Sequence, residues 1–212
     1  MKNLHLILFC LITFIGFGQN NTTLSYSQQL IQSKERILQS SDSTFHKIIH
    51  NELIECIFPR WYNTPWDYNG YTNTPKQGVI ACGYFVSTTL KHIGFNLNRY
   101  DIAKMYSSAI VKVLCHNDYE VKNSYKDFSS YCSQLNDGLY ILGLSNHVGF
   151  LSIETGEAYF IHSDYSSEKG VRKEKIEDSF ALKNSYSFWV GNFSNQTETY
   201  LSYFSHVEYL KI

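Results

Sequence analysis

Residues 77–94 read QGVIACGYFVSTTLKHIG, and a single cysteine, Cys82, lies near the middle of this stretch. Around it, a glycine-containing loop gives way to an amphipathic pattern. The apolar residues after the cysteine recur at helical spacing, and Gly94 is a typical helix stop; they are Phe85, Val86, Leu90 and Ile93. The stretch therefore predicts a helix over residues 81–93 that begins at the cysteine.

A cysteine at the start of a helix lies at the positive end of the backbone dipole and beside unpaired amide hydrogens, which favour the thiolate. Cys82 is therefore a candidate nucleophile that is available near neutral pH. Its own N–H could hold an oxyanion, and Gly83 would let a substrate approach the backbone. The alternative is a buried thiol at the start of a core helix, and position alone does not separate the two.

Two histidines far downstream favour the catalytic interpretation. His147 opens the run HVGFLSI and His162 closes the run AYFIH. A two-residue turn at residues 155–156 places His162 opposite Gly149, and a four-residue turn places it opposite His147. Both imidazoles then lie on one face of the sheet, whereas a three-residue turn would separate them. We predict that His147 accepts the thiol proton and that His162 orients its ring.

Each histidine alone has a simpler explanation, a half-buried strand residue with a satisfied hydrogen bond. The three residues together favour catalysis. No CxxC pattern or other metal motif is present, so no metal and no cofactor are expected. Whether Cys115 pairs with Cys132 stays open at this point.

The pattern along the chain predicts an α+β fold, with N-terminal helices packed on a C-terminal antiparallel sheet. Helices are expected over residues 24–39 and 45–57, the second ended by Pro59, and further helices over 100–114 and 124–135. After Asn136-Asp137-Gly138 the chain changes to short runs rich in β-branched and aromatic residues. The expected strands lie within residues 138–145, 147–154, 157–164, 170–176 and 185–193.

Residues 1–18, MKNLHLILFCLITFIGFG, have the features of a signal peptide: a positive start, a short apolar run and small residues before a cut. The expected location is secreted or periplasmic, without stable membrane insertion once the signal is removed; an uncleaved anchor is the alternative. Residues 19–60 form a helical extension that acts as a brace or as a lid over the cleft. Residues 61–212 form the main domain.

The composition of the chain limits the kinds of binding partner that are expected. The 212 residues carry a formal charge of −1, which gives no electrostatic reason to expect a nucleic acid. Seventeen tyrosines and fourteen phenylalanines against three prolines indicate one well-packed domain with a real core. The oligomeric state is not determined by the sequence.

The order of these residues resembles the NlpC/P60 cysteine peptidases, compact papain-like enzymes that cut bacterial peptidoglycan stem peptides. The family's nucleophile motif is similar to ACGYFV at residues 81–86, and its histidine segment is similar to HVGF and YFIHSDYSSEKGVR. The resemblance covers about residues 64–171. It implies a papain-like fold and a catalytic triad of Cys82, His147 and His162.

The loop before the nucleophile, WYNTPWDYNGYTNTPK at residues 61–76, is rich in aromatic residues and indicates a substrate-binding loop. Trp66 and Gly70 match the family's aromatic residue and glycine at this place. Trp66, Tyr68 and Gly83 are the candidate substrate-binding residues, and Gln77 is a candidate oxyanion residue. The chain departs from the family at Ala81, where an acidic residue is usual, at Gly83, where a serine is usual, and at Trp66, which replaces a tyrosine.

The sequence thus predicts an exported thiol hydrolase that cleaves an amide bond in peptidoglycan through a thioester acyl-enzyme. One alternative is a non-catalytic cell-surface module that binds a glycan or peptide on the same fold. Another is a secreted effector that hydrolyses protein amides or acyl esters. Which bond is cut does not follow from the sequence.

Overall fold

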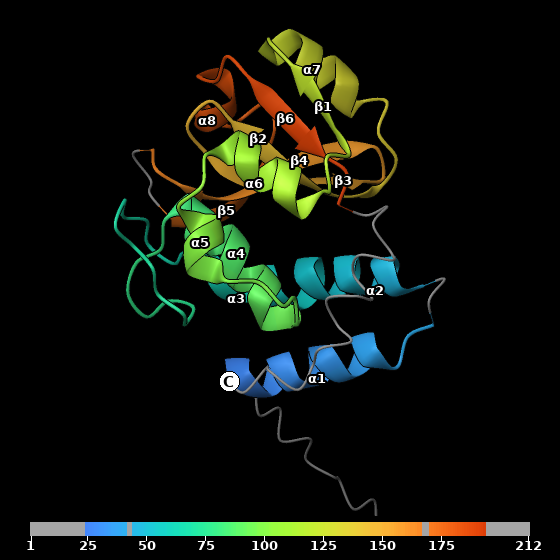
Figure 1. The fold of residues 1–212 in the computed structure, drawn as a ribbon, viewed down its shortest axis with the longest axis vertical. Helices are drawn as coiled ribbons and strands as arrows, with labels where there is room; N and C mark the ends of the chain where they lie inside the picture. The colour runs from blue at the N-terminus through green and yellow to red at the C-terminus, as the bar shows by residue number, and fades with distance from the viewer. Residues whose placement is uncertain (1–23, 42–43, 167–169, 194–212) are drawn as a thin grey trace, which may run out of the picture.

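A computed structural model describes residues 24–41, 44–166 and 170–193 of the chain, and these residues form an α+β fold (Figure 1). Its centre is a six-stranded sheet with the order β1-β6-β2-β3-β4-β5, antiparallel at every pairing. The strands are β1 (Tyr119–Lys122), β2 (Gly138–Leu144), β3 (Val148–Glu154), β4 (Glu157–Asp164), β5 (Gly170–Lys175) and β6 (Phe188–Gly191). The predicted α+β class is confirmed, while the predicted signal peptide, residues 1–18, lies outside the described residues.

The strands β2 to β6 match the runs predicted from sequence, but β1 was missed. Its four residues are only half-buried or exposed, so no buried face shows in their pattern. They pair with β6 and precede the helix α7. The sequence predicted that the helices all come before the sheet. This prediction is wrong, because β1 precedes α7.

The helices cover both faces of this sheet. They are α1 (Tyr26–Leu38), α2 (Phe45–Asn51), the π-helix η1 (Glu52–Ile57), α3 (Phe58–Trp61), α4 (Cys82–Ile93), α5 (Arg99–Ala103), α6 (Ser107–Leu114), α7 (Tyr125–Cys132) and α8 (Phe180–Lys183). Figure 1 shows α4 and α2 between the sheet and α1, with α7 at the opposite end of the molecule from α1.

The prediction that Pro59 ends the second helix is wrong. The chain widens into the π-helix η1, in which the N–H of Phe58 bonds to the carbonyl of Leu53, and then continues as α3 to Trp61. Pro59 lies in the first turn of α3, where a missing N–H costs no helical hydrogen bond. The change of hydrogen-bond register is what lets the helical run pass through a proline.

The prediction of one helix over residues 100–114 is also wrong, because the run is divided between α5 and α6. A Cβ at Gly83 would lie 2.6 Å from the Ala103 carbonyl oxygen, so α5 packs tightly on α4. A Cβ at Gly143 would lie 2.9 Å from the Ser107 carbonyl oxygen, so α6 packs on β2 instead. Two different packing partners separate the helices and leave residues 104–106 as a connection.

The core has two parts, one on each face of the sheet. In β2, Leu139 and Ile141 belong to the part shared with α1 to α6. The alternate residues Tyr140, Leu142 and Leu144 belong to the part shared with α7 and α8. All of β2 is buried for this reason, as expected of a strand covered on both faces.

The N-terminal helices contribute directly to the first part of the core. Leu30 and Ile37 of α1, Phe45 and Ile49 of α2, and Leu53, Ile57 and Phe58 after them are all nearly inaccessible to solvent. Residues 24–41 and 44–60 are thus an integral layer of the fold rather than a detachable appendage.

The cysteines of the described chain are free thiols. Cys115 belongs to the core part on one face of the sheet and Cys132 to the part on the other face. The sheet lies between them, so the pairing left open by the sequence does not form. Within residues 24–41, 44–166 and 170–193, no helix combines the length and apolar character needed to span a membrane.

Candidate functional site

The turn between β3 and β4 sets the positions of the two histidines. Phe150 pairs with Ile161 and Glu154 with Glu157, which is the two-residue register. Both turn residues have positive φ, 51° at Thr155 and 80° at Gly156, as a type I′ turn requires. The carboxylate of Asp137 accepts hydrogen bonds from both turn amides, at 3.0 and 3.2 Å. Asp137 thus stabilises a backbone conformation that threonine adopts rarely.

In this register the histidines share one face of the sheet, as predicted. Nε2 of His147 lies 2.8 Å from Nδ1 of His162, and the two rings are nearly perpendicular. The side chains are almost fully buried, at 2% and 0% exposure. Gly149 lies beside them, and a Cβ there would approach the His162 Cβ to 2.8 Å. Glycine is therefore needed for the histidine pair to fit.

A third group, Glu174 on β5, extends the pair and was missed by the sequence analysis. Its Oε1 lies 3.0 Å from Nε2 of His162. Burial raises the pKa of Glu174, but hydrogen bonds from His162 and Ser179 and the charge of Arg172 outweigh burial and leave it below the usual value. Nothing in the β5 sequence GVRKEK distinguishes Glu174 from its neighbours. It could have been identified only from the pairing of β5 with β4.

The carboxylate fixes the direction of the hydrogen bonds through both rings. An ionised glutamate only accepts, so a neutral His162 carries its proton on Nε2 and offers Nδ1 as an acceptor. His147 then donates from Nε2 to that acceptor. The remaining nitrogen of His147, Nδ1, is left with a free lone pair, which is the form needed for a general base.

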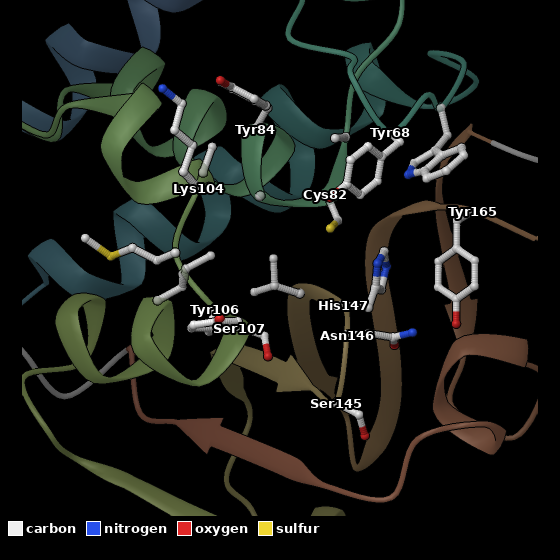
Figure 2. Close-up of a pocket in the computed structure, with 17 residues that line it drawn as sticks. Tyr68, Cys82, Tyr84, Lys104, Tyr106, Ser107, Ser145, Asn146, His147 and Tyr165 are labelled. Atoms are coloured by element: carbon white, nitrogen blue, oxygen red, sulfur yellow. The ribbon is translucent and has the colours of Figure 1, made fainter.

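Cys82 is the first residue of α4, and Ala81 precedes it in an extended conformation without a side-chain cap. Figure 2 shows its sulfur pointing into the cleft on the side of His147. Burial raises the pKa of the thiol, although the backbone amides of Val148, Gly83 and Cys82 itself act in the opposite direction. The sequence analysis expected a thiolate, but burial outweighs the helix terminus and the resting form is the thiol.

His147 is the matching neutral partner. Burial lowers its pKa well below 6.5. A histidine with a lowered pKa stays neutral at pH values where an exposed imidazole would be partly protonated. The site therefore holds a thiol beside a neutral base at rest, and a proton must move when the sulfur attacks.

These residues open into a cleft of about 640 Å³. Aromatic rings supply much of its wall, namely Trp66, Tyr68, Tyr84, Tyr106 and Tyr165. The ring of Tyr165 lies 5.1 Å from that of His147 and 6.3 Å from that of Trp66. The aromatic loop and the histidine strands thus meet at one end of the cleft.

Three of the residues predicted to bind substrate line this cleft: Trp66, Tyr68 and Gly83. Gln77 does not; it is exposed, in a loop closed by the bridge between Tyr71 and Ile80. The sequence analysis missed the part of the wall formed by residues 103–107, 145–146 and 165. Residues 103–107 were not predicted to line the cleft because residues 100–114 were predicted to form one helix.

The loop that carries Trp66 is tied to the N-terminal helix by a partly buried hydrogen-bond network. Trp61 donates from Nε1 to the Tyr26 hydroxyl at 2.8 Å, and that hydroxyl lies 2.9 Å from Nδ1 of His92. Nε2 of His92 lies 3.1 Å from Oδ1 of Asn73, an acceptor that also receives a hydrogen bond from Arg99. His92 is thus a neutral bridge that accepts from Tyr26 and donates to Asn73, so α1 acts as a brace.

This bridge makes stability sensitive to acid. Burial lowers the pKa of His92 from 6.5 to about 4, so the unfolded chain binds the proton more tightly than the folded one. Stability is therefore full above the unfolded pKa and falls as the pH drops from about 6.5 to 4. The loss attributable to His92 is about 3 kcal/mol by pH 4.

Urea unfolding at pH 7 and pH 4 measures this effect as the difference between the wild type and His92→Asn. We expect the variant to be less stable at pH 7 and to lose about 3 kcal/mol less on acidification. Equal pH dependence in the two proteins would contradict a buried neutral His92. His46, a half-buried residue of α2 outside this network, provides His46→Asn as the matched control.

His162, Asp164 and Glu174 form the one group of three potential metal ligands in the described part of the chain. Both nitrogens of His162 are already hydrogen-bonded, one to His147 and one to Glu174. The guanidinium of Arg172 lies 3.5 Å from Asp164 and 4.0 Å from Glu174. A cation already occupies the position between these acids, so the group fits an orienting role better than metal binding.

Comparison of this chain with protein-family models, with curated proteins and with solved structures finds no match. The functional assignment therefore rests on the chemistry of the cleft residues.

Proposed function

We propose that this protein is an exported thiol hydrolase that cleaves an amide bond in peptidoglycan stem peptides. The observation that carries the proposal is the hydrogen-bonded series Glu174–His162–His147, which leaves one nitrogen of His147 as a base beside Cys82. A buried series with one fixed proton direction is the arrangement that a nucleophile with a general base requires.

In the proposed mechanism, the sulfur of Cys82 attacks the amide carbonyl as Nδ1 of His147 takes the thiol proton. The backbone amides of Cys82 and Gly83, in the first turn of α4, donate to the oxygen that becomes negative. The C–N bond then breaks, and His147 returns its proton to the leaving amine. Water attacks the thioester with His147 as base, and the carboxylic acid and free thiol are released.

Because burial raises the pKa of Cys82 and lowers that of His147, a thiolate–imidazolium pair is unfavourable at rest, and the mechanism requires the proton to move together with attack on the carbonyl. The lowered pKa of His147 keeps the base unprotonated in mildly acidic conditions. Both directions follow from burial, and neither group needs to be charged at rest.

The peptidoglycan substrate and the export are supported by the sequence. Residues 64–171 resemble the NlpC/P60 peptidases in the order of their motifs, and residues 1–18 have the pattern of a signal peptide. The aromatic cleft gives room for a peptide or glycan, because exposed rings offer large contact surfaces at low entropic cost.

The test is incubation of the mature wild-type protein with purified muropeptides, followed by mass spectrometry of the products and of the acid-quenched protein. We expect a cleaved stem peptide and an acyl mass increment on the tryptic peptide that contains Cys82. The products also identify the bond. Absence of cleavage from folded protein across a panel of stem peptides, protein amides and acyl esters would overturn the hydrolase proposal.

A second candidate, a non-catalytic binding module on the same fold, is favoured by one observation: the pKa of Cys82 is raised rather than lowered. A module of this kind would bind muropeptides in the aromatic cleft without turning them over. Muropeptide binding with no acyl-enzyme and no cleavage supports this candidate.

A further inference from the structure

The turn after β4 places the ring of Tyr165 beside the histidine pair. Asp164, the last residue of β4, is 2% exposed, and its carboxylate accepts hydrogen bonds from the backbone N–H and the hydroxyl of Ser166 at 2.9 and 2.5 Å. An aspartate bonded in this way to the backbone two residues on fixes a turn. The ring of Tyr165 then packs against Trp66, 6.3 Å away, and Phe180 of α8, 6.4 Å away. Contacts from three segments therefore hold this ring.

The ring of Tyr165 lies where His147 meets the cleft. His147 is one of the residues that line the cleft, yet it is only 2% exposed, so other side chains must cover it. Its ring neighbours are His162 at 5.0 Å, Tyr165 at 5.1 Å and Phe160 at 6.0 Å. Of these three, only Tyr165 also lines the cleft. Figure 2 shows Cys82 on one side of His147 and Tyr165 on the other.

Burial, rather than a neighbouring charge, sets the protonation of His147. The titratable and charged groups around it come from four segments: Cys82 of α4, His162 and Asp164 of β4, Arg172 and Glu174 of β5, and Lys104 between α5 and α6. The two acids and the arginine lie behind His162, and Lys104 is directed away from Cys82 in Figure 2. Burial raises the pKa of the Tyr165 hydroxyl, so this ring adds no charge.

We infer that Tyr165 is a positioning residue whose ring covers the histidine pair on the cleft side and keeps water away from His147. The inference rests on the proposed function, in which His147 is the general base, and it adds the residue that keeps this base neutral. An imidazole covered by an aromatic ring loses the hydration that stabilises its cation. Without the ring, water would reach His147 and its pKa would rise toward 6.5, so the base would be lost in mildly acidic conditions.

NMR titration of the histidine rings in the mature protein, over about pH 4 to 8, tests this inference directly. In Tyr165→Ala we expect the midpoint of His147 to lie at least about one pH unit above that of the wild type. Tyr165→Phe keeps the ring and should keep the wild-type midpoint. Tyr106→Ala, the matched control, removes an 87% exposed ring from the same cleft and should also leave the midpoint unchanged. The His147 signal is assigned from its loss in His147→Gln.

The pH profile of cleavage gives a second readout. Relative to the wild type, Tyr165→Ala should lower the ratio of kcat/KM at about pH 5 to that at about pH 7.5 by about tenfold, because a base with an ordinary pKa is protonated at the lower pH. A ring with a merely structural role would lower kcat/KM equally at both pH values.

An unchanged His147 midpoint in folded Tyr165→Ala overturns the inference, and so does an equal rise in Tyr165→Phe or in Tyr106→Ala. If Tyr165→Ala does not fold, Tyr165→Val takes its place: a smaller rise supports the inference and no rise overturns it. The titration needs no turnover. Failure of the proposed function, seen as the absence of any cleavage, is therefore distinct from failure of this inference.

Discussion

Replacing Cys82 with alanine is expected to lower kcat for muropeptide cleavage by at least about 10⁴-fold, because the sulfur that forms the acyl-enzyme is lost. The fold should be retained, since the side chain loses a single atom at the start of α4 and the helix is held by its other buried residues. The measurement is product formation by mass spectrometry, with thermal unfolding as the check on folding.

Cys56 supplies the matched control, because it is also a half-buried free thiol but lies in η1 among the N-terminal helices. Cys56→Ala should cleave at the wild-type rate. Equal activity in the wild type and Cys82→Ala, after removal of any copurified peptidase, would show that another group performs the reaction.

Replacing His162 with leucine is expected to lower kcat by about 10³-fold with a much smaller change in KM. His147 would lose the acceptor that holds its Nε2 proton, and the wrong tautomer, with the proton on Nδ1, would become accessible. Leucine fills much of the same volume in a position that is fully buried and stacked on Phe160. The measurement is steady-state kinetics on the cleaved muropeptide.

Glu174→Gln tests the same series from its far end. A carboxamide can donate as well as accept, so the proton direction through His162 is no longer fixed, and we expect kcat to fall about tenfold. Nitrogen NMR of the imidazoles separates an orienting role from a structural one. His147 should carry its proton on Nε2 in the wild type, and the variant should show a mixture. A wild-type pattern in an impaired variant would contradict the orienting role.

The local sequence pattern was enough to predict much of the fold, because the secondary structure follows the periodicity of apolar residues. Phe85, Val86, Leu90 and Ile93 share one helix face, and α4 forms over the predicted residues with Gly94 after it, at a φ of 121°. The alternation of side-chain direction along β3 and β4 likewise fixes which residues share a face, so His147 and His162 could be placed together once a turn length was assumed.

Features that depend on distant partners could not be read in this way. Whether residues 100–114 form one helix or two depends on Gly83 and Gly143, which receive the two halves. The acid behind His162 comes from β5, and its identity follows only from strand pairing.

The sequence by itself therefore determined the α+β class and the helix that begins at Cys82, because each depends on spacing within a short segment, while the shared face of the two histidines also needed the turn length that the structure supplies. Only the tertiary structure decided the direction of the pKa shift of the thiol and the acid that directs the histidines. These two depend on burial and on contacts between segments far apart in the chain, and burial changes the pKa of a group without leaving any mark in the local sequence.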